Sequence, residues 1–253
     1  MIDPRWIEPQ WPLAAGVRAL ITTRVGGYSQ GPWGDVSGHN GLNLGLGSDD
    51  AATVERNRQR LAAVLPAPPV WLQQVHGSTV VDAAGLAWGT QADGAVTRKP
   101  GVVCCVLVAD CLPVLLADAL GRGVGIAHAG WRGLAGGVIQ AAVRQLRGTV
   151  GDPHARILAF LGPAIGPGQF VVGPEVREAM CRSLATAPQA FVEHPPDRYR
   201  ANLYALARMA LAQEGVEAVF GGDWCTVSDP ERFYSFRRDR VTGRQAALIW
   251  MEK

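Results

Sequence analysis

The sequence contains little lysine and little histidine. Lys99 and Lys253 are the only lysines among 24 basic residues, and the chain has five histidines. The 22 acidic residues leave a formal net charge of +2, so the molecule has no strong positive field that would attract nucleic acid or an anionic membrane. The abundance of arginine, alanine, glycine and proline is typical of a GC-rich genome and does not indicate a nucleic-acid-binding protein.

The sequence also lacks a long uninterrupted apolar segment. The longest candidate, Val102 to Ala117, contains Asp110 and Pro113, which predicts that no membrane span is present. Acidic residues and prolines occupy the start of the chain, where a signal peptide needs a basic end and an apolar run. The cysteines are odd in number, and Cys104 and Cys105 are adjacent, so they do not indicate a disulfide framework. We therefore expect a cytoplasmic protein that has no membrane partner.

What the sequence does contain is enough apolar material for a large core. Of 253 residues, 48% are hydrophobic and 18% are charged. No internal repeat, low-complexity tract or linker is visible, and strand and helix patterns alternate throughout. The sequence therefore predicts one α/β (α+β) domain over residues 1–253, with a mixed β-sheet and helices on its faces.

The expected elements follow from apolar runs, capping residues and chain-breaking residues. Strands are expected over 20–23, 70–75, 79–82, 93–97, 102–108, 113–117, 123–128, 157–161, 218–220 and 246–250. Helices are expected over 51–65, 134–146, 175–184 and 201–213. Residues 31–48, rich in glycine, asparagine and serine, are expected to form a long surface loop, and Ser48, Asp49 and Asp50 are candidate N-caps for the first helix.

Three short segments each place a candidate metal ligand at a strand end or break. The ligands are His76, Cys111 and His128, separated in the chain by 35 and 17 positions. Two imidazoles and a thiolate suit Zn²⁺, and three protein ligands leave a fourth position for water or substrate, as in catalytic zinc sites. Taken singly, Cys111 could equally be a small core residue, and each histidine an ordinary hydrogen-bonding residue. The site therefore exists only if the fold brings the three segments together.

Other polar residues near these segments could contribute to a site. Arg24 ends the first expected strand before two glycines, and Arg132 precedes a helix N-terminus, where free N–H groups favour anions. Arg237 and Arg238 follow an aromatic segment, and each arginine could instead form a salt bridge.

Together these segments resemble the YfiH-like, laccase-domain family, long labelled multicopper polyphenol oxidase and now regarded as purine nucleoside phosphorylase. The resemblance runs through nearly the whole chain and is most specific at residues 128–133, His-Ala-Gly-Trp-Arg-Gly. The other matching segments are 22–29, 42–45, 57–58, 74–77, 109–113, 162–167, 172–176, 225–226, 233–239 and 242–244.

The resemblance implies the layered α/β sandwich of the YfiH-like fold, with a mixed β-sheet core and helices on its faces. It implies zinc, or copper as the alternative, on His76, Cys111 and His128. The implied catalytic residues are these three and Asp110, and the implied substrate-binding residues are Arg24, Asn43, Gln74 and Arg132. The implied activity is phosphorolysis of adenosine, inosine and methylthioadenosine, with adenosine deamination as a second reaction. In that deamination Asp110 could move protons, as a glutamate does in nucleobase deaminases. The expected partners are a small nucleoside and phosphate, and the chain is expected to be a monomer or a small homo-oligomer.

Three alternatives remain open. A copper-dependent, laccase-like polyphenol oxidase would use the same His₂Cys set, although five histidines are few for a multi-copper cluster. A metal-free hydrolase acting on cell-wall peptide precursors would use Cys111 as nucleophile and His128 as base, with Asp110 or His76 orienting the imidazole. A closed metal site without an adjoining cleft would instead indicate a scaffold or binding module.

Overall fold

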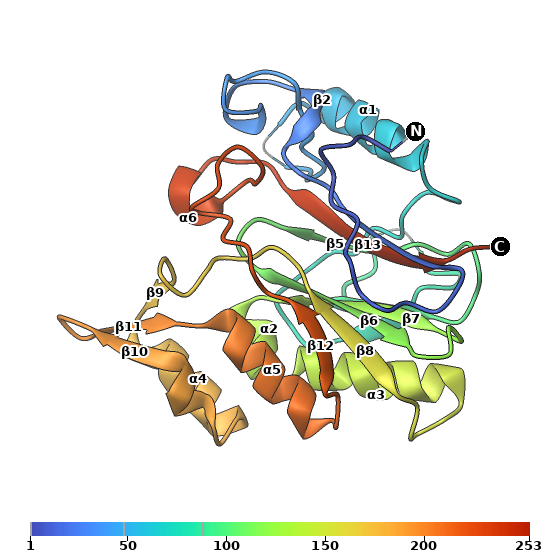
Figure 1. The fold of residues 1–253 in the computed structure, drawn as a ribbon. Helices are drawn as coiled ribbons and strands as arrows, with labels where there is room; N and C mark the ends of the chain where they lie inside the picture. Colours follow the sequence, from blue (N-terminus) through green and yellow to red (C-terminus); the bar gives the residue numbers. More distant parts are fainter. Residues whose placement is uncertain (1, 48, 88) are drawn as a thin grey trace.

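Four layers of secondary structure make up the protein (Figure 1). The structure is a computed structural model that describes residues 2–47, 49–87 and 89–253. Helix α1 (Ala51–Ala62) forms one outer layer, and helices α2 to α5 form the other. Two β-sheets lie between these layers, one with three strands and one with six. This single mixed α/β domain confirms the fold class predicted from the sequence.

The three-stranded sheet joins distant parts of the chain. Its strands are β1 (Val17–Ile21), β13 (Gln245–Met251) and β5 (Cys104–Val108), in the order β1-β13-β5. Both pairings are antiparallel. Side chains of β13 alternate between two faces: Ala247 and Ile249 pack toward the other sheet, whereas Leu248 and Trp250 pack toward α1. This period of two is what a strand covered on both faces requires.

The six-stranded sheet forms the centre of the molecule, in the order β12-β8-β6-β7-β4-β3. Its two edge pairs, β12 with β8 and β3 with β4, are parallel, and the inner pairs are antiparallel. The strands are β3 (Val80–Asp82), β4 (Gly94–Thr97), β6 (Leu112–Asp118), β7 (Val124–Ala129), β8 (Ile157–Leu161) and β12 (Ala218–Gly221). All residues of β6, β7 and β8 are buried, which explains their nearly continuous apolar sequences.

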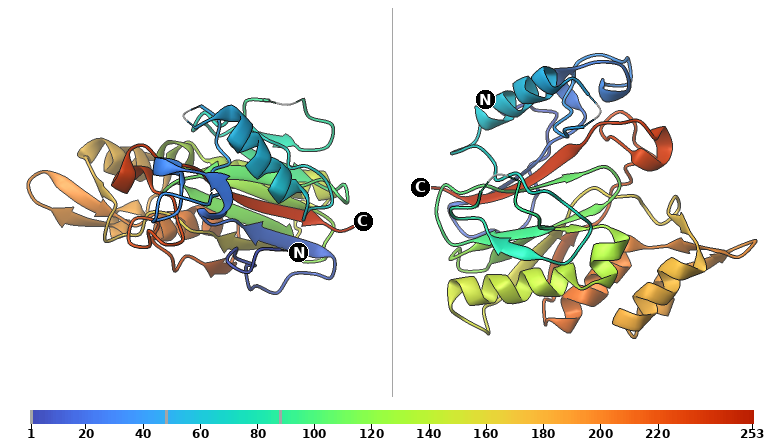
Figure 2. Two further views of the ribbon diagram at one scale, coloured as in Figure 1. Left: turned by 90° about the horizontal axis from the view of Figure 1, so that it is seen from above. Right: turned by 180° about the vertical axis from the view of Figure 1, so that it is seen from behind.

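The helical layer and smaller elements complete the fold. The helices beside the six-stranded sheet are α2 (Trp131–Ala135), α3 (Val138–Val150), α4 (Pro174–Ser183) and α5 (Leu203–Gln213). A small sheet of β9 (Val171–Val172), β10 (Phe191–His194) and β11 (Arg198–Ala201) lies beside α4, away from the main sheets (Figure 2). The remaining elements are β2 (Val25–Ser29), α6 (Phe236–Asp239) and two 3₁₀ helices (Gly31–Trp33 and Ala187–Ala190). In the described part of the chain, no helix is both long and apolar enough to cross a membrane.

Several expectations for individual elements are wrong. Residues 134–146 do not form one helix, because Gly137, with φ of 84°, separates α2 from α3. Residues 70–75 form no strand and make only isolated bridges at Val70 and Gln73. Among the candidate N-caps, Asp50 caps α1 by accepting a hydrogen bond from the N–H of Thr53, while Ser48 lies outside the described residues.

The expected surface loop over 31–48 is also only partly at the surface. Residues 41–45 are buried. Leu42 and Leu44 pack with α1 and the three-stranded sheet, in the same cluster as Leu61 and Leu248. Burying an apolar side chain of this size contributes about 1.5–3 kcal/mol. The glycine-rich composition therefore led to a wrong prediction for residues 41–45, which belong to the core.

Candidate metal centre and its cleft

His76, Cys111 and His128 come together at one point of the six-stranded sheet. Their candidate ligand atoms all lie within 4.8 Å of one another. The Sγ of Cys111 is 3.8 Å from Nε2 of His76, and the two imidazole rings meet edge to face with their centroids 4.8 Å apart. Within the described residues this is the one group of three or more His, Cys, Asp or Glu side chains that could hold a metal ion.

The strand register explains how two of these ligands meet. Cys111 immediately precedes β6, and His128 is the fifth residue of β7. Because β6 and β7 are antiparallel and pair Leu112 with Ala129 and Pro113 with His128, the turn holding Cys111 lies beside the end of β7. Cys111 and His128, 17 positions apart, thus become neighbours through main-chain pairing, which the sequence alone could not show.

Asp93 fixes the two histidines relative to each other, and sequence analysis assigned it no role. Its carboxylate is fully buried and accepts a hydrogen bond from Nδ1 of His128 at 2.8 Å. It also accepts hydrogen bonds from the main-chain N–H groups of Val75, His76 and Gly77 at 3.2, 2.9 and 2.7 Å. The first contact leaves Nε2 of His128 free to face Cys111, as expected when a carboxylate orients a metal-binding imidazole. The other contacts hold the turn at His76, whose φ is 60°.

Gly130 leaves space that the candidate metal centre occupies. A Cβ at this position would lie 2.9 Å from Sγ of Cys111 and 3.0 Å from Cδ2 of His76. The φ of Gly130 is −63°, so its backbone conformation is open to any residue, and the requirement for glycine is steric. The glycine after His128 in the sequence motif therefore has a direct structural reason.

Without a metal, the charges of the group favour an ion pair between Cys111 and His128. Burial alone would raise the pKa of the Cys111 thiol, but hydrogen bonds and charge interactions with His128 and His76 outweigh burial and lower the pKa to about 6. Burial would lower the pKa of His128, but the hydrogen bonds to Asp93 and Cys111 outweigh it and raise the pKa to about 9. Cys111 is thus a thiolate at neutral pH, the form in which cysteine binds metals. His128 carries a proton when no metal is bound, so a metal ion must displace that proton from Nε2. Two imidazole nitrogens and one thiolate, with space enforced by Gly130, fit a divalent metal such as zinc.

A cleft of about 660 Å³ opens onto the three ligands. Its lining residues come from the segment after Asn43, from α1, from residues 71–76, from the turn between β5 and β6, and from the chain around α6. They are Gly45, Leu46, Arg58, Trp71, Leu72, Gln73, Gln74, His76, Gly89, Leu107, Val108, Ala109, Cys111, His128, Phe236 and Arg244. An open cleft beside the ligands is what a catalytic metal needs and a closed structural site lacks.

Of the predicted substrate-binding residues, Gln74 lines this cleft and Asn43 lies just behind it. The side chain of Gln74 is fixed to Leu107, donating to its carbonyl at 2.8 Å and accepting from its N–H at 2.7 Å. Asn43 is fully buried, and its Oδ1 accepts hydrogen bonds from the N–H groups of Gly45 and Arg244. Asn43 therefore shapes the cleft wall through the main chain.

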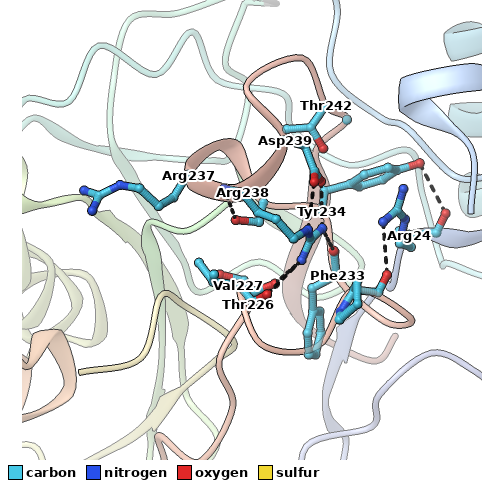
Figure 3. Close-up of polar contacts among 12 residues, drawn as sticks. Arg24, Thr226, Val227, Phe233, Tyr234, Arg237, Arg238, Asp239 and Thr242 are labelled. Atoms are coloured by element: carbon cyan, nitrogen blue, oxygen red, sulfur yellow. Dashed lines mark hydrogen bonds and ion pairs between the residues drawn. The ribbon is translucent and has the colours of Figure 1, made fainter. Parts of the chain in front are cut away.

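Arg24 and Arg132 do not line the cleft. Arg24 is buried and donates hydrogen bonds to the carbonyls of Gly34 and Pro230. It lies beside Tyr234, 5.1 Å from the ring centroid (Figure 3). Arg132 is exposed and stacks on Trp131 at 4.3 Å. Their roles as phosphate ligands remain predictions.

Asp110 is held by the segment that leads into α6. Its Oδ1 accepts a hydrogen bond from the hydroxyl of Thr226 at 2.5 Å, and its Oδ2 accepts from the N–H of Arg237 at 2.7 Å. Arg238 donates to the carbonyls of Thr226 and Phe233, whereas the Arg237 side chain points away from this network (Figure 3). Asp110 therefore joins the Cys111 turn to the C-terminal region, and its part in proton transfer remains a prediction. The expectation that Asp110 or His76 orients His128 is wrong, since Asp93 does so.

Comparison with known proteins shows which family the chain belongs to. The family model described as multi-copper polyphenol oxidoreductase laccase matches residues 18–252. The chain belongs to this laccase-like family. This confirms the resemblance stated from the sequence.

Curated relatives of this family member carry a second name. A protein named purine nucleoside phosphorylase from Pseudomonas aeruginosa is 49% identical, over 98% of this chain and 98% of its own length. The purine nucleoside phosphorylase YfiH of Escherichia coli is 48% identical, over 97% and 98%. These names support an enzyme.

Solved structures agree on the fold. A Neisseria meningitidis protein of the family DUF152 superposes with a TM-score of 0.91 at 42% identity, covering 98% of this chain and all of the other. YlmD from Geobacillus stearothermophilus superposes with a TM-score of 0.88 at 32% identity, covering 100% and 98%. The YfiH-like fold is therefore shared along the whole chain.

Proposed function

We propose that this laccase-family chain is a zinc-dependent purine nucleoside phosphorylase that acts on adenosine, inosine and methylthioadenosine. Adenosine deamination is proposed as a second reaction in the same cleft. The observation that carries the proposal is that His76, Cys111 and His128 converge on one cleft, in a chain nearly half identical to proteins named purine nucleoside phosphorylase. The nucleoside and phosphate are the proposed small-molecule partners.

The size and lining of the cleft suit a nucleoside. Its volume of about 660 Å³ falls in the range of roughly 300–1,000 Å³ that is common for small-molecule sites. Leu46 and Phe236 are about half exposed in the cleft, and Trp71 lines it too. Such side chains can cover the flat face of a purine base.

Phosphorolysis exchanges one bond at the sugar for another. A phosphate oxygen bonds to C1′ of the ribose while the bond from C1′ to the purine nitrogen breaks. The purine leaves with that electron pair and takes up the proton that the phosphate loses. Zinc on His76, Cys111 and His128 would supply a Lewis acid that stabilises negative charge developing in the cleft.

The chain's own residues prepare the ligand set for this role. Asp93 accepts the hydrogen of Nδ1 of His128, so that Nε2 is the nitrogen that would bind zinc once it has lost its proton. Cys111 is kept as a thiolate by the two histidines. In the proposed deamination, Asp110 would move protons from its position beside Cys111.

Product analysis on protein of measured metal content tests the proposal. With adenosine and phosphate, adenine and ribose 1-phosphate are expected, and inosine appears if deamination occurs as well. Cys111→Ala should lose metal and turnover together, whereas Cys181→Ala, which changes a cysteine of α4 that does not line the cleft, should keep both. Zinc-containing protein that leaves all three nucleosides unchanged would reject the proposal.

A thiol hydrolase is a second candidate that one observation favours. Cys111, His128 and Asp93 form a chain of hydrogen-bonding groups in which the carboxylate orients the imidazole and the thiol has a low pKa. Nucleophile, base and orienting group in this order are the requirement for thiol catalysis. Loss of peptidase or amidase activity with iodoacetamide but not with chelators would support this candidate.

One measurement distinguishes a copper-dependent oxidase from the phosphorylase and from the thiol hydrolase. The family description contains the words polyphenol oxidoreductase, and His₂Cys sets also occur in copper proteins. Oxygen consumption with catechol that increases in proportion to bound copper would favour a polyphenol oxidase.

A further inference from the structure

Two arginines, Arg58 and Arg244, line the cleft beside the candidate metal ligands. Arg58 belongs to α1 and Arg244 immediately precedes β13, so the fold brings them together from opposite ends of the chain. Among the described residues, no ion pair is formed by either side chain. None of the described lining residues is Asp or Glu. The cleft therefore presents two cations that no lining carboxylate neutralises.

Leu44 fixes the two arginines relative to each other. Its carbonyl accepts hydrogen bonds from Nε and Nη2 of Arg58 at 3.0 and 2.9 Å, and its N–H donates to the carbonyl of Arg244 at 3.1 Å. Arg58 is further held against Trp71, 4.2 Å from the ring centroid. One residue thus connects both arginines, and the pair is positioned before any ligand arrives.

Asn43 and Gly45 position Arg244 specifically. Asn43 accepts the N–H of Arg244 at 2.9 Å. The aliphatic stem of Arg244 runs over Gly45, where a Cβ would lie 2.7 Å from Cγ of the arginine. Nη1 of Arg244 donates to the carbonyls of Thr242 and Gly243 at 3.2 and 2.9 Å, whereas no hydrogen bond within the described residues uses Nε or Nη2. These two nitrogens form one edge of the planar fork that binds phosphate oxygens in pairs.

We propose that Arg244, with Arg58 as a second cation, is the phosphate anchor of this cleft. The assignment rests on the proposed phosphorolysis only for the identity of the anion as co-substrate phosphate. The sequence favoured Arg24 and Arg132 as phosphate ligands. The proposal assigns this role instead to Arg244 and Arg58, which line the same cleft as Cys111. Burial lowers the pKa of both guanidinium groups, a cost that a bound anion offsets.

Direct binding of inorganic phosphate tests the assignment without turnover. Isothermal titration of the zinc-containing protein with phosphate should give saturable binding. Arg244→Gln should weaken it about 10- to 100-fold, the range for a lost charge-assisted pair of hydrogen bonds, and Arg58→Gln should weaken it less. Arg18→Gln is the matched control and should leave phosphate binding unchanged. Arg18 belongs to β1, is exposed, forms an ion pair with Glu252 and does not line the cleft.

A second variant keeps the test valid if Arg244→Gln fails to fold. Gly45→Ala retains the charge but forces the stem of Arg244 to shift, so phosphate binding should weaken while zinc content stays the same. Absence of saturable phosphate binding to the unmodified protein would overturn the assignment. Arg244→Gln that binds within twofold of wild type, or loss of binding only in Arg132→Gln, would overturn it too.

Two further measurements separate this assignment from the proposed function. Adenosine 5′-monophosphate is titrated in parallel; if it binds through Arg244 and inorganic phosphate does not, the anion is a nucleotide phosphate and the co-substrate assignment fails. If phosphate binds through Arg244 but no ribose 1-phosphate forms, the anchor stands and the phosphorylase proposal fails. If Arg244→Gln carries out phosphorolysis with an unchanged KM for phosphate, the phosphorylase proposal stands and the assignment of Arg244 as the phosphate anchor fails.

Discussion

Replacing Gly130 by alanine should weaken metal binding without disturbing the backbone. The new Cβ would lie 2.9 Å from Sγ of Cys111 and 3.0 Å from Cδ2 of His76. Non-bonded heavy atoms prefer separations of about 3.5–4.0 Å, so one or both ligands must move by roughly 0.5–1 Å. Metal–ligand distances tolerate deviations of only about 0.2 Å.

The expected magnitude follows from this displacement. Changes next to metal ligands typically weaken metal binding about 10- to 100-fold, which corresponds to about 1.4–2.8 kcal/mol. Competition for zinc against a chromophoric chelator measures this change directly. The φ of −63° at Gly130 allows alanine, so the variant should fold with a near-normal far-UV circular dichroism spectrum.

Gly148→Ala is the matched control for Gly130→Ala. Gly148 lies within α3, and a Cβ there would meet no atom within 4 Å. Alanine inside a helix is favoured over glycine by about 0.5–1 kcal/mol, so this control should keep wild-type zinc affinity and gain stability. If Gly130→Ala binds zinc as tightly as the control does, the steric argument for the metal centre is refuted.

Three other predictions concern the residues around the ligands. Asp93→Asn should lower zinc affinity about 10- to 100-fold in the chelator assay, because His128 loses the carboxylate that orients it; undiminished affinity would count against this role. In metal-free protein, alkylation of Cys111 by iodoacetamide should have its midpoint near pH 6, because the histidines lower the pKa of the thiol and the thiolate is lost only as pH falls through that value; mass spectrometry against Cys111→Ala measures it, and a midpoint above pH 8 would contradict it. Asp110→Ala should cost about 1–3 kcal/mol in urea unfolding, because two hydrogen-bond donors lose their buried acceptor; unchanged stability would show that those bonds contribute little.

The candidate ligand residues could be nominated from the sequence, although the local signal of each one is weak when it is taken singly. Imidazole and thiol groups next to Gly or Pro at strand ends are uncommon enough to attract attention, and the segment 128–133 is specific. Their convergence could not be derived, since it depends on the pairing of Leu112 with Ala129. Asp93 could not be found, because an aspartate before a short strand is usually only a turn residue, and its contacts come from segments 16 to 35 positions away.

The error in the segment 31–48 has a clear physical origin. Glycine and asparagine between residues 31 and 48 have the composition of a surface loop, yet Leu42 and Leu44 are fully buried there. Tertiary packing against α1 decided the burial of this segment, whereas composition reports only local preference. The same segment holds Arg58 and Arg244 in place through Asn43 and Leu44, and these are the two arginines that we propose as phosphate ligands in place of Arg24 and Arg132.

The place of β13 in its sheet has a consequence for biosynthesis. β13 follows every other element in the chain, yet it is the middle strand between β1 and β5. During synthesis those two strands therefore wait with unpaired edges, which invite pairing with other chains. The sheet closes, and Arg244 reaches the cleft, only when the end of β13 has left the ribosome, so a nascent chain would benefit from a chaperone until then.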